Sequence, residues 1–426
     1  MLYLTNNEFS LKPLFGRNDL FYPDLNVNIS KILPTMLTLF DYKFPKIKTL
    51  LQEIDSKNNW NELLESEIKN ILFVTIDALG YQQFMKYSTL LKKKFVKYGM
   101  VISSVFPTIT STCITTLKYG EMPIDHGIVG HKINIPEIDN IVNTLTLRSK
   151  NSIISLPYAG VNVKHWVWTD LPHIEDKNFN YHGLIENHIA NSGLSYLVHG
   201  KQDSIGYSSN VDCFAAAQRI LETIEKKNRL IDVYIGSIDH IQHRYTNDSP
   251  VLEQELKTIE QTLFWMLKQL GQKIASETAI VITADHGQEN ITSDNKIVIS
   301  SEEDDELINL IRTRGRSGRV IHLYSKEDKQ EEVVEFFTDK VGEKGIILTP
   351  KDYPKLMGKG AESPKIVERL GDVQVILGDK ASLFFGHSGE YDSTFGLGLN
   401  ATHGSLSKNE LLVPLLIGRV TDLLSK

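Results

Sequence analysis

The sequence lacks the features that place a protein outside the cell or within a membrane. It has two cysteines, Cys113 and Cys213, which are too few for a disulfide framework, so nothing indicates an oxidising compartment. Its first residues lack the basic start, apolar core and small-residue cleavage site of a secretory leader. No apolar run approaches the roughly 20 residues of a membrane-spanning helix. We therefore expect a cytoplasmic protein without a membrane partner.

An excess of positive charge is also absent. The 426 residues have a formal net charge of −7, which argues against a surface that coats nucleic acid and leaves open a small phosphate-bearing substrate. We find no internal repeat and no low-complexity segment. The length suits one large α/β domain with insertions, or two domains.

Four short segments of apolar and β-branched residues are typical of strands buried on both faces of a parallel sheet. They cover residues 69–77, 100–106, 231–238 and 278–284. Helical patterns lie between them, and residues 250–270 have a strong apolar stripe. We therefore predict an α/β fold with a largely parallel central sheet that is flanked by helices on both faces.

The rest of the pattern divides the chain. Residues 1–60 are predicted to be an irregular lead-in, and residues 61–290 together with 395–426 form the core around the sheet. Residues 291–394 are predicted to be a smaller inserted α/β lobe or cap. The pattern is weaker between residues 130 and 210, where we expect excursions over the sheet edge.

Three predicted strands end near carboxylates, namely Asp77, Asp239 and Asp285. The C-terminal ends of parallel strands meet at one edge of a sheet, where ligands bind. Three histidines accompany them: His243, His286 and His403. Asp and His ligands suit zinc or a neighbouring first-row metal. Six of them suit two metals about 3.5–4 Å apart, the arrangement used for in-line displacement at phosphorus.

Each of these features alone has an ordinary explanation. Asp285 and His286 before a glycine are compatible with a capped strand end and a turn. The Asp-x-x-x-His spacing at residue 239 is common in helices, and His403 alone is compatible with a structural role. The prediction depends on their occurrence together, each carboxylate behind a predicted strand.

A segment rich in hydroxyls follows the predicted strand at residues 100–106. Residues 108–112 read Thr-Ile-Thr-Ser-Thr and lead into a helical pattern. Hydroxyl side chains favour the start of a helix, and helix N-termini bind anions. Capping is the alternative role of Ser111 and Thr112.

Together these segments resemble the alkaline phosphatase superfamily, most closely its nucleotide pyrophosphatase/phosphodiesterase branch. The matching segments are ILFVTIDALG, FPTITSTCITTLKYGEMPIDHGI, SIDHIQH, VITADHG and THG. The resemblance runs from roughly residue 70 to residue 420, and the inserted blocks have no match. It implies an alkaline phosphatase-like fold and a metal-dependent hydrolase of phosphate esters. Its cofactors would be two divalent ions, with zinc expected and manganese or iron as alternatives.

The resemblance also implies roles for single residues. Thr110 matches the nucleophile of the family. The ligands of the metal that touches this nucleophile match Asp77, Asp285 and His286. The ligands of the other metal match Asp239, His243 and His403. A metal lowers the pKa of a bound oxygen, so Thr110 would attack phosphorus and form a phosphothreonine.

Two departures from the family bear on the substrate. Phosphodiesterase members often have an Asn a short way beyond the nucleophile, whereas this segment has Cys113, a poor donor. Thr112 or the backbone would have to replace that Asn. The residues after Cys113 also lack the Cys-x-Pro-x-Arg motif of sulfatases. Tyr81 is a further candidate to contact a base or line the pocket, with core packing as its alternative.

Other features leave alternatives open. The arginines between residues 312 and 319 are compatible with a grip on a phosphate-rich leaving group or with an exposed hairpin. Trp166 and Trp168 are compatible with a nucleobase lid or a half-buried strand, and His126, His131 and His387 with turns or packing. We expect a small phosphate-ester or nucleotide substrate and no stable nucleic-acid complex. The alternative functions are a phosphomonoesterase or phosphomutase, or a metal- or nucleotide-binding protein without turnover.

Overall fold

The centre of the computed structural model is a seven-stranded sheet with the order β2-β18-β9-β1-β8-β6-β7. The structure describes residues 11–42, 49–50, 63, 67–150, 152–169, 179–191, 193–199, 204–386 and 399–425. The strands of this main sheet are β1 (Asn70–Ile76), β2 (Gly99–Ser103), β6 (Phe179–Glu186), β7 (Ile205–Tyr207), β8 (Asn228–Ile235), β9 (Thr278–Thr283) and β18 (Leu412–Arg419). Five adjacent strands run parallel, and β18 is antiparallel to both its neighbours. The largely parallel central sheet is therefore confirmed.

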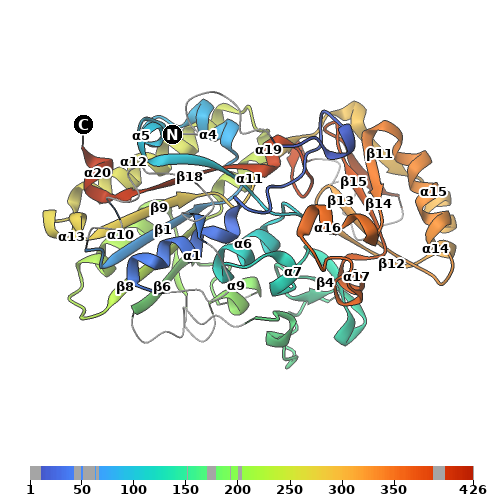
Figure 1. Ribbon diagram of the computed structural model, residues 1–426, viewed down its shortest axis with the longest axis horizontal. Coiled ribbons are helices and arrows are strands. Elements are labelled where there is room, and N and C mark those ends of the chain that lie inside the picture. The colour runs from blue at the N-terminus through green and yellow to red at the C-terminus, as the bar shows by residue number, and fades with distance from the viewer. Residues whose placement is uncertain are drawn as a thin grey trace.

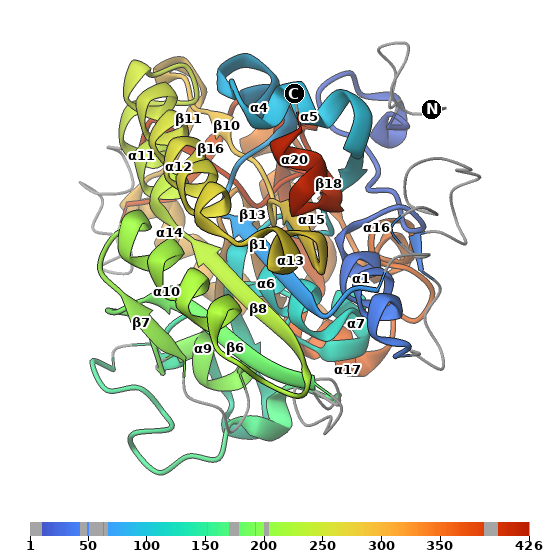
Figure 2. The same ribbon diagram turned by 90° about the vertical axis from the view of Figure 1, so that its left-hand side faces the viewer.

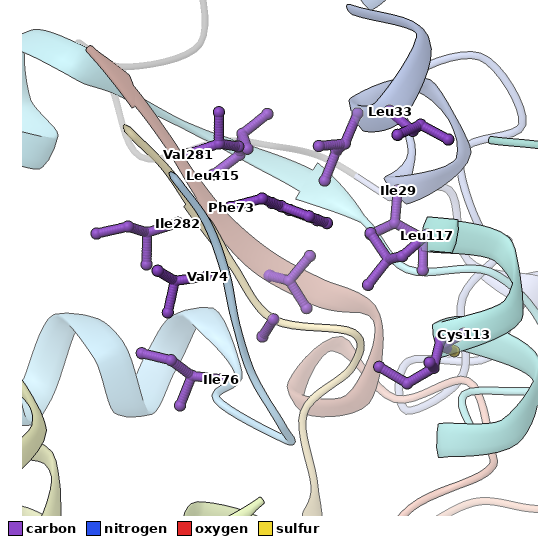
Figure 3. Close-up of a cluster of buried hydrophobic side chains, with 14 of the residues drawn as sticks. Ile29, Leu33, Phe73, Val74, Ile76, Cys113, Leu117, Val281, Ile282 and Leu415 are labelled. Atoms are coloured by element: carbon purple, nitrogen blue, oxygen red, sulfur yellow. The ribbon is translucent and has the colours of Figure 1, made fainter. Parts of the chain in front are cut away.

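The main sheet is apolar because both of its faces are covered. All seven residues of β1 are buried. Phe73 points toward Ile29 and Leu117, whereas Val74 and Ile76 lie on the opposite face of the strand (Figure 3). Side chains alternate between faces along a strand, so a strand buried on both faces needs apolar residues at nearly every position.

Helices cover the two faces of the main sheet. The longer ones near it are α4 (Tyr81–Tyr87), α5 (Leu91–Tyr98), α6 (Thr110–Tyr119), α10 (Asn210–Glu222), α11 (Ser237–Tyr245) and α12 (Pro250–Gln269). Figure 2 shows α10 and α12 on one side of β1 and β8, and α6 with α1 (Ile32–Leu37) on the other. Leu252, Leu256 and Ile259 of α12 are fully buried, as its apolar stripe predicted. Among the described residues, no helix combines the length and apolar character needed to cross a bilayer.

A second seven-stranded sheet lies beside the main sheet (Figure 1). Its strand order is β14-β15-β13-β12-β3-β4-β5, and each pairing is antiparallel. The strands are β3 (Lys132–Ile135), β4 (Asn140–Asn143), β5 (Arg148–Ser149), β12 (Ile311–Ser317), β13 (Val320–Ser325), β14 (Gly345–Leu348) and β15 (Val373–Leu377). The sheet thus combines strands from the weakly patterned residues 130–210 with strands from the predicted inserted lobe, residues 291–394.

The second sheet has helices and a small core of its own. Helices α14 (Ser301–Leu310) and α15 (Gln330–Val341) lie at its outer side (Figure 1). Phe337 of α15 packs in a separate buried cluster with Leu323 and Val375. Two short pairs complete the strands: β10 (Glu289–Asn290) with β17 (Ala401–Thr402), and β11 (Lys296–Ile299) with β16 (Ser382–Phe385).

Short helices connect these parts. They are α7 (Pro123–His126), α9 (Gly193–Val198), α13 (Gln272–Ser276), α16 (Pro354–Met357), α17 (Pro364–Leu370), α19 (Lys408–Leu411) and α20 (Val420–Leu424). The half-buried strand, one of the two alternatives for Trp166 and Trp168, does not form, because Lys164–Trp166 is a 3-10 helix with Trp166 buried. His387 and the expected return to the core near residue 395 lie outside the described residues.

Candidate metal centre

The carboxyl ends of three adjacent strands hold the predicted carboxylates. Asp77 follows β1, and Asp285 lies two residues beyond the end of β9. Asp239 lies in the first turn of α11, directly after β8. Because β9, β1 and β8 are parallel neighbours, their ends bring the three side chains to one edge of the sheet.

The first group contains Asp77, Asp285 and His286, whose ligand-type atoms all lie within 4.8 Å of one another. The Nε2 atom of His286 is 3.6 Å from Asp77 Oδ1 and 3.3 Å from Asp285 Oδ2. The same nitrogen is 3.2 Å from the hydroxyl of Thr110, the first residue of α6. The structure therefore brings the predicted nucleophile to the first group.

The second group contains Asp239, His243 and His403, again with ligand-type atoms within 4.8 Å. The Nε2 atoms of His243 and His403 are 3.3 and 3.5 Å from Asp239 Oδ1. The rings of His286 and His403 stack with centroids 4.1 Å apart, so the two groups adjoin. Two helical positions one turn apart supply Asp239 and His243, and the segment after β17 supplies His403.

The histidines are oriented as metal ligands. Each of the three directs Nδ1 at a backbone carbonyl oxygen at between 2.8 and 3.1 Å; these oxygens belong to Ala401, Thr108 and Gly287. A carbonyl oxygen can only accept, so Nδ1 donates to it and Nε2 is the nitrogen that faces the site. Three such nitrogens beside three carboxylates fit two divalent cations.

The carboxylates also suit a site for divalent cations. Asp77 Oδ1 and Asp285 Oδ2 are buried without a hydrogen-bond partner in the part of the chain that the structure describes. Burial, together with the charge of Asp285, raises the pKa of Asp77 well above its usual value, and burial raises the pKa of Asp285 to about 7. Crowded and buried carboxylates are costly without positive charge, and divalent cations would supply it.

Two residues that orient the carboxylates were not found from the sequence. The Tyr234 hydroxyl donates to Asp77 Oδ2, and the Gln288 amide donates to Asp239 Oδ1. Tyr234 lies within β8, where its sequence pattern indicates only a strand. Gln288 follows the Asp-His-Gly turn, and nothing in the local sequence ties it to residue 239.

The predicted substrate-contact residues occupy three different environments. Thr112 is fully buried in the first turn of α6, and its hydroxyl has no partner among the described residues. Cys113 instead faces the apolar core (Figure 3), with Sγ 3.3 Å from the hydroxyl of Ser104. Burial raises the pKa of the Cys113 thiol well above its usual value. Tyr81 is half-buried and packs 5.9 Å from the ring of Phe95.

The basic run between residues 312 and 319 forms the hairpin β12–β13, in which Arg312 is exposed but the later arginines are not. Arg319 is fully buried, and its guanidinium is 2.7 Å from the carboxylate of Glu410. Arg316 is nearly buried and donates to the carbonyls of Gly318 and Leu383. These two arginines bind the protein itself.

Known proteins resemble this chain in sequence. A family model described as type I phosphodiesterase / nucleotide pyrophosphatase matches residues 72–405, more than half of the chain. Human ectonucleotide pyrophosphatase/phosphodiesterase family member 7 is 21% identical over 208 residues, which are 45% of this chain and 41% of that relative. The match thus spans less than half of the curated relative.

Solved structures share the fold. Murine ectonucleotide pyrophosphatase/phosphodiesterase 5 has a TM-score of 0.60 at 16% identity, over 81% of this chain and 87% of that one. The human protein of the same name has a TM-score of 0.60 at 18% identity, over 82% and 87%. An inactive variant of the murine protein, solved in complex with AMP, has the same TM-score at 17% identity, over 82% and 87%. The resemblance found in the sequence is confirmed.

Proposed function

Because the chain belongs to the type I phosphodiesterase / nucleotide pyrophosphatase family, we propose that it hydrolyses phosphodiester or pyrophosphate bonds of nucleotides at a two-metal centre with Thr110 as nucleophile. The observation that supports this most is the position of the Thr110 hydroxyl, at the start of α6 and 3.2 Å from Nε2 of His286. A nucleotide substrate agrees with the AMP complex of the structural relative.

The two ligand groups suit two zinc ions, with manganese or iron as alternatives. Once bound, such cations supply Lewis acidity at the attacking and leaving oxygens. Asp77, Asp285 and His286 would hold the cation next to Thr110; Asp239, His243 and His403 would hold the other. The chain's own part is to place these donors and the nucleophile around one phosphoryl group.

Helix α6 is suited to hold that phosphoryl group. Its N-cap residue, Ile109, has an apolar side chain and makes no capping hydrogen bond to the N-terminal N–H groups. These groups and the positive end of the helix dipole favour anionic oxygens. The Thr112 hydroxyl, which has no partner among the described residues, is a further donor on this turn. Thr110 attacks phosphorus, the P–O bond to the leaving group breaks, and water then hydrolyses the phosphothreonine.

One observation favours a second candidate, a phosphomonoesterase or phosphomutase on the same core. Cys113 faces the core and offers no amide donor to a phosphoryl oxygen, whereas phosphodiesterase relatives often have an Asn beyond the nucleophile. A cytoplasmic location stays a prediction from the sequence.

The test compares the zinc-loaded protein with its Thr110→Ala variant on a chromogenic phosphate diester and the matching monoester. We expect diester cleavage that chelation abolishes, and a loss on the order of 10³-fold or more in the variant with zinc content unchanged. Thr115→Ala is the matched control, because the Thr115 hydroxyl bonds the carbonyl of Ser111 one turn along α6.

Each other outcome selects a different conclusion. Faster cleavage of the monoester would favour the phosphomonoesterase. Full turnover by Thr110→Ala would remove this residue from the mechanism. Zinc binding with no turnover on either ester would favour a binding protein.

A further inference from the structure

The second sheet contacts the metal centre at the backbone of His403. We infer that Arg319 of the second sheet is a positioning residue, which fixes the segment containing His403 by way of Glu410. This inference rests on the proposed two-metal function. It predicts that the second sheet helps to determine how tightly one of the two metals binds.

The turn between β12 and β13 packs directly on the backbone of His403. The N–H of Arg319 donates to the His403 carbonyl at 2.8 Å. Gly318 and Gly404 have φ values of +58° and +111°. A Cβ on Gly318 would overlap the His403 carbonyl oxygen, and one on Gly404 would overlap the carbonyl oxygen of Ser317. The two backbones are therefore in contact without room for a side chain.

The side chain of Arg319 secures this contact. Its guanidinium donates to the carbonyls of Gly378 and Ala381, both at 3.0 Å, and to Glu410 Oε2 at 2.7 Å. Arg319 and Glu410 both have no exposed side-chain surface. The pair thus joins the second sheet to α19 in the interior of the protein.

Glu410 in turn holds the segment that follows His403. Its Oε1 atom accepts from the N–H of Ser405 at 2.9 Å, and Oε2 accepts from the N–H of Ser407 at 3.1 Å. Its backbone carbonyl accepts from the N–H of Gly287, next to His286. Burial raises the pKa of Glu410, and the charge of Arg319 opposes that shift.

Removing the Arg319 charge would leave a buried carboxylate without its cation. Such a group takes up a proton or moves toward water, and breaking a buried pair is strongly destabilising. Either response weakens the bonds from Glu410 to Ser405 and Ser407. His403 is the ligand that this segment presents to Asp239, whereas Asp239 and His243 share helix α11. The group with His403 should therefore lose its metal first.

The experiment measures zinc bound per folded chain, after loading and gel filtration, in wild type and in Arg319→Met. We expect about two equivalents in wild type and about one in the variant, with the weaker site losing on the order of 10- to 100-fold in affinity by chelator competition. Arg314→Met is the matched control. Arg314, in β12 of the same sheet, also pairs with a buried carboxylate, that of Asp304 in α14. We expect it to retain two equivalents.

The outcomes separate the inference from the proposed function. Two equivalents with unchanged affinity in Arg319→Met would overturn the inference, as would equal losses in both variants. Wild type that binds no zinc would overturn the proposed function itself. If Arg319→Met does not fold by circular dichroism, Glu410→Gln decides. It keeps the size of the side chain, but one carboxylate oxygen becomes an amide nitrogen, which cannot accept the hydrogen bonds that Glu410 now accepts from Arg319, Ser405 and Ser407, so it must lose the second equivalent for the inference to stand.

Discussion

Buried charge at the ends of the main-sheet strands differs from buried charge in the second sheet. At the ends of the main-sheet strands, Asp77 and Asp285 keep buried oxygens without hydrogen-bond partners among the described residues. In the second sheet, Arg319 and Arg314 are paired with Glu410 and Asp304. Buried charge that lacks a partner indicates a place for an added cation, whereas paired charge serves the fold.

Strand direction explains much of this difference. Parallel strands end on the same side, so the main sheet gathers polar residues at one edge, next to the start of α6. Antiparallel strands alternate in direction, and the second sheet instead offers a tight hairpin turn to its neighbour. The contrast predicts that changes at the ends of the main-sheet strands affect chemistry, and that changes in the second sheet away from its contact with His403 affect stability.

The largest effect should follow from Asp285→Asn, compared with Asp304→Asn. The first change removes a ligand-type oxygen and should lower turnover on the order of 10³-fold or more, with loss of one zinc equivalent. The second removes the partner of Arg314 and should lower the free energy of unfolding by about 2 kcal/mol, with turnover per folded molecule unchanged. Initial rates, zinc content and urea unfolding test the pair. Equal losses of turnover in Asp285→Asn and Asp304→Asn would contradict the distinction between the two sheets.

A core truncation tests whether the sheets unfold separately. Phe337 lies in the smaller cluster on the outer side of the second sheet, whereas Phe73 lies in the large cluster, which contains the main sheet and some residues of the second. Replacing either by Ala should lower the free energy of unfolding by about 3–5 kcal/mol, because a cavity remains. We expect Phe337→Ala to unfold in two steps by circular dichroism in urea, with the second sheet opening first. A single shifted transition would show that both sheets unfold as one unit.

Lowering the pH should weaken zinc binding by protonating Asp285, just beyond a strand of the main sheet. Burial raises the pKa of Asp285 to about 7, so below that pH the carboxyl is protonated and a proton competes with the metal. Zinc affinity should fall about tenfold for each pH unit below 7. Above pH 7 Asp285 is ionised, so its protonation should contribute less to the pH dependence of the affinity. Titration with a chelator between pH 5.5 and 8.5 measures this. Affinity that is flat below pH 7 would contradict the assignment of Asp285 as a ligand.

The smallest effect is expected from Tyr81→Phe. Tyr81 is half-buried and its ring packs near Phe95, so loss of the hydroxyl should change KM by less than about twofold. Steady-state kinetics on the diester measures it, with Tyr87→Phe as a comparison on the same helix. A tenfold rise in KM specific to Tyr81→Phe would place its hydroxyl at the substrate.

The sequence was most informative where burial is complete. Strands β1, β8 and β9 are short apolar runs, and the residues just beyond their ends could be predicted to meet because parallel strands share a direction. The second sheet was harder. Its strands β3, β4 and β5 have four or fewer residues, too few to show alternation, and they join partners from beyond residue 310.

The parts of the site that could not be predicted depend on distant partners. All ten residues of α6 are buried, so its sequence has no amphipathic pattern to show that Cys113 faces the core. Arg319 meets Glu410 from the far end of the chain, and a run of arginines gives no indication of such a partner. Tyr234 and Gln288 reach Asp77 and Asp239 only in the folded chain, so no local sequence pattern indicates these contacts.

Strand β18 has a consequence for biosynthesis. It is the latest of the main-sheet strands in the sequence, yet it lies inside the sheet, between β9 and β2. A nascent chain that has not yet made residues 412–419 has an uncovered edge on β9 and no sheet partner for β2. Uncovered edges promote aggregation. Completion of the main sheet must therefore wait for translation of β18, and a premature stop before it would favour degradation over a partly active enzyme.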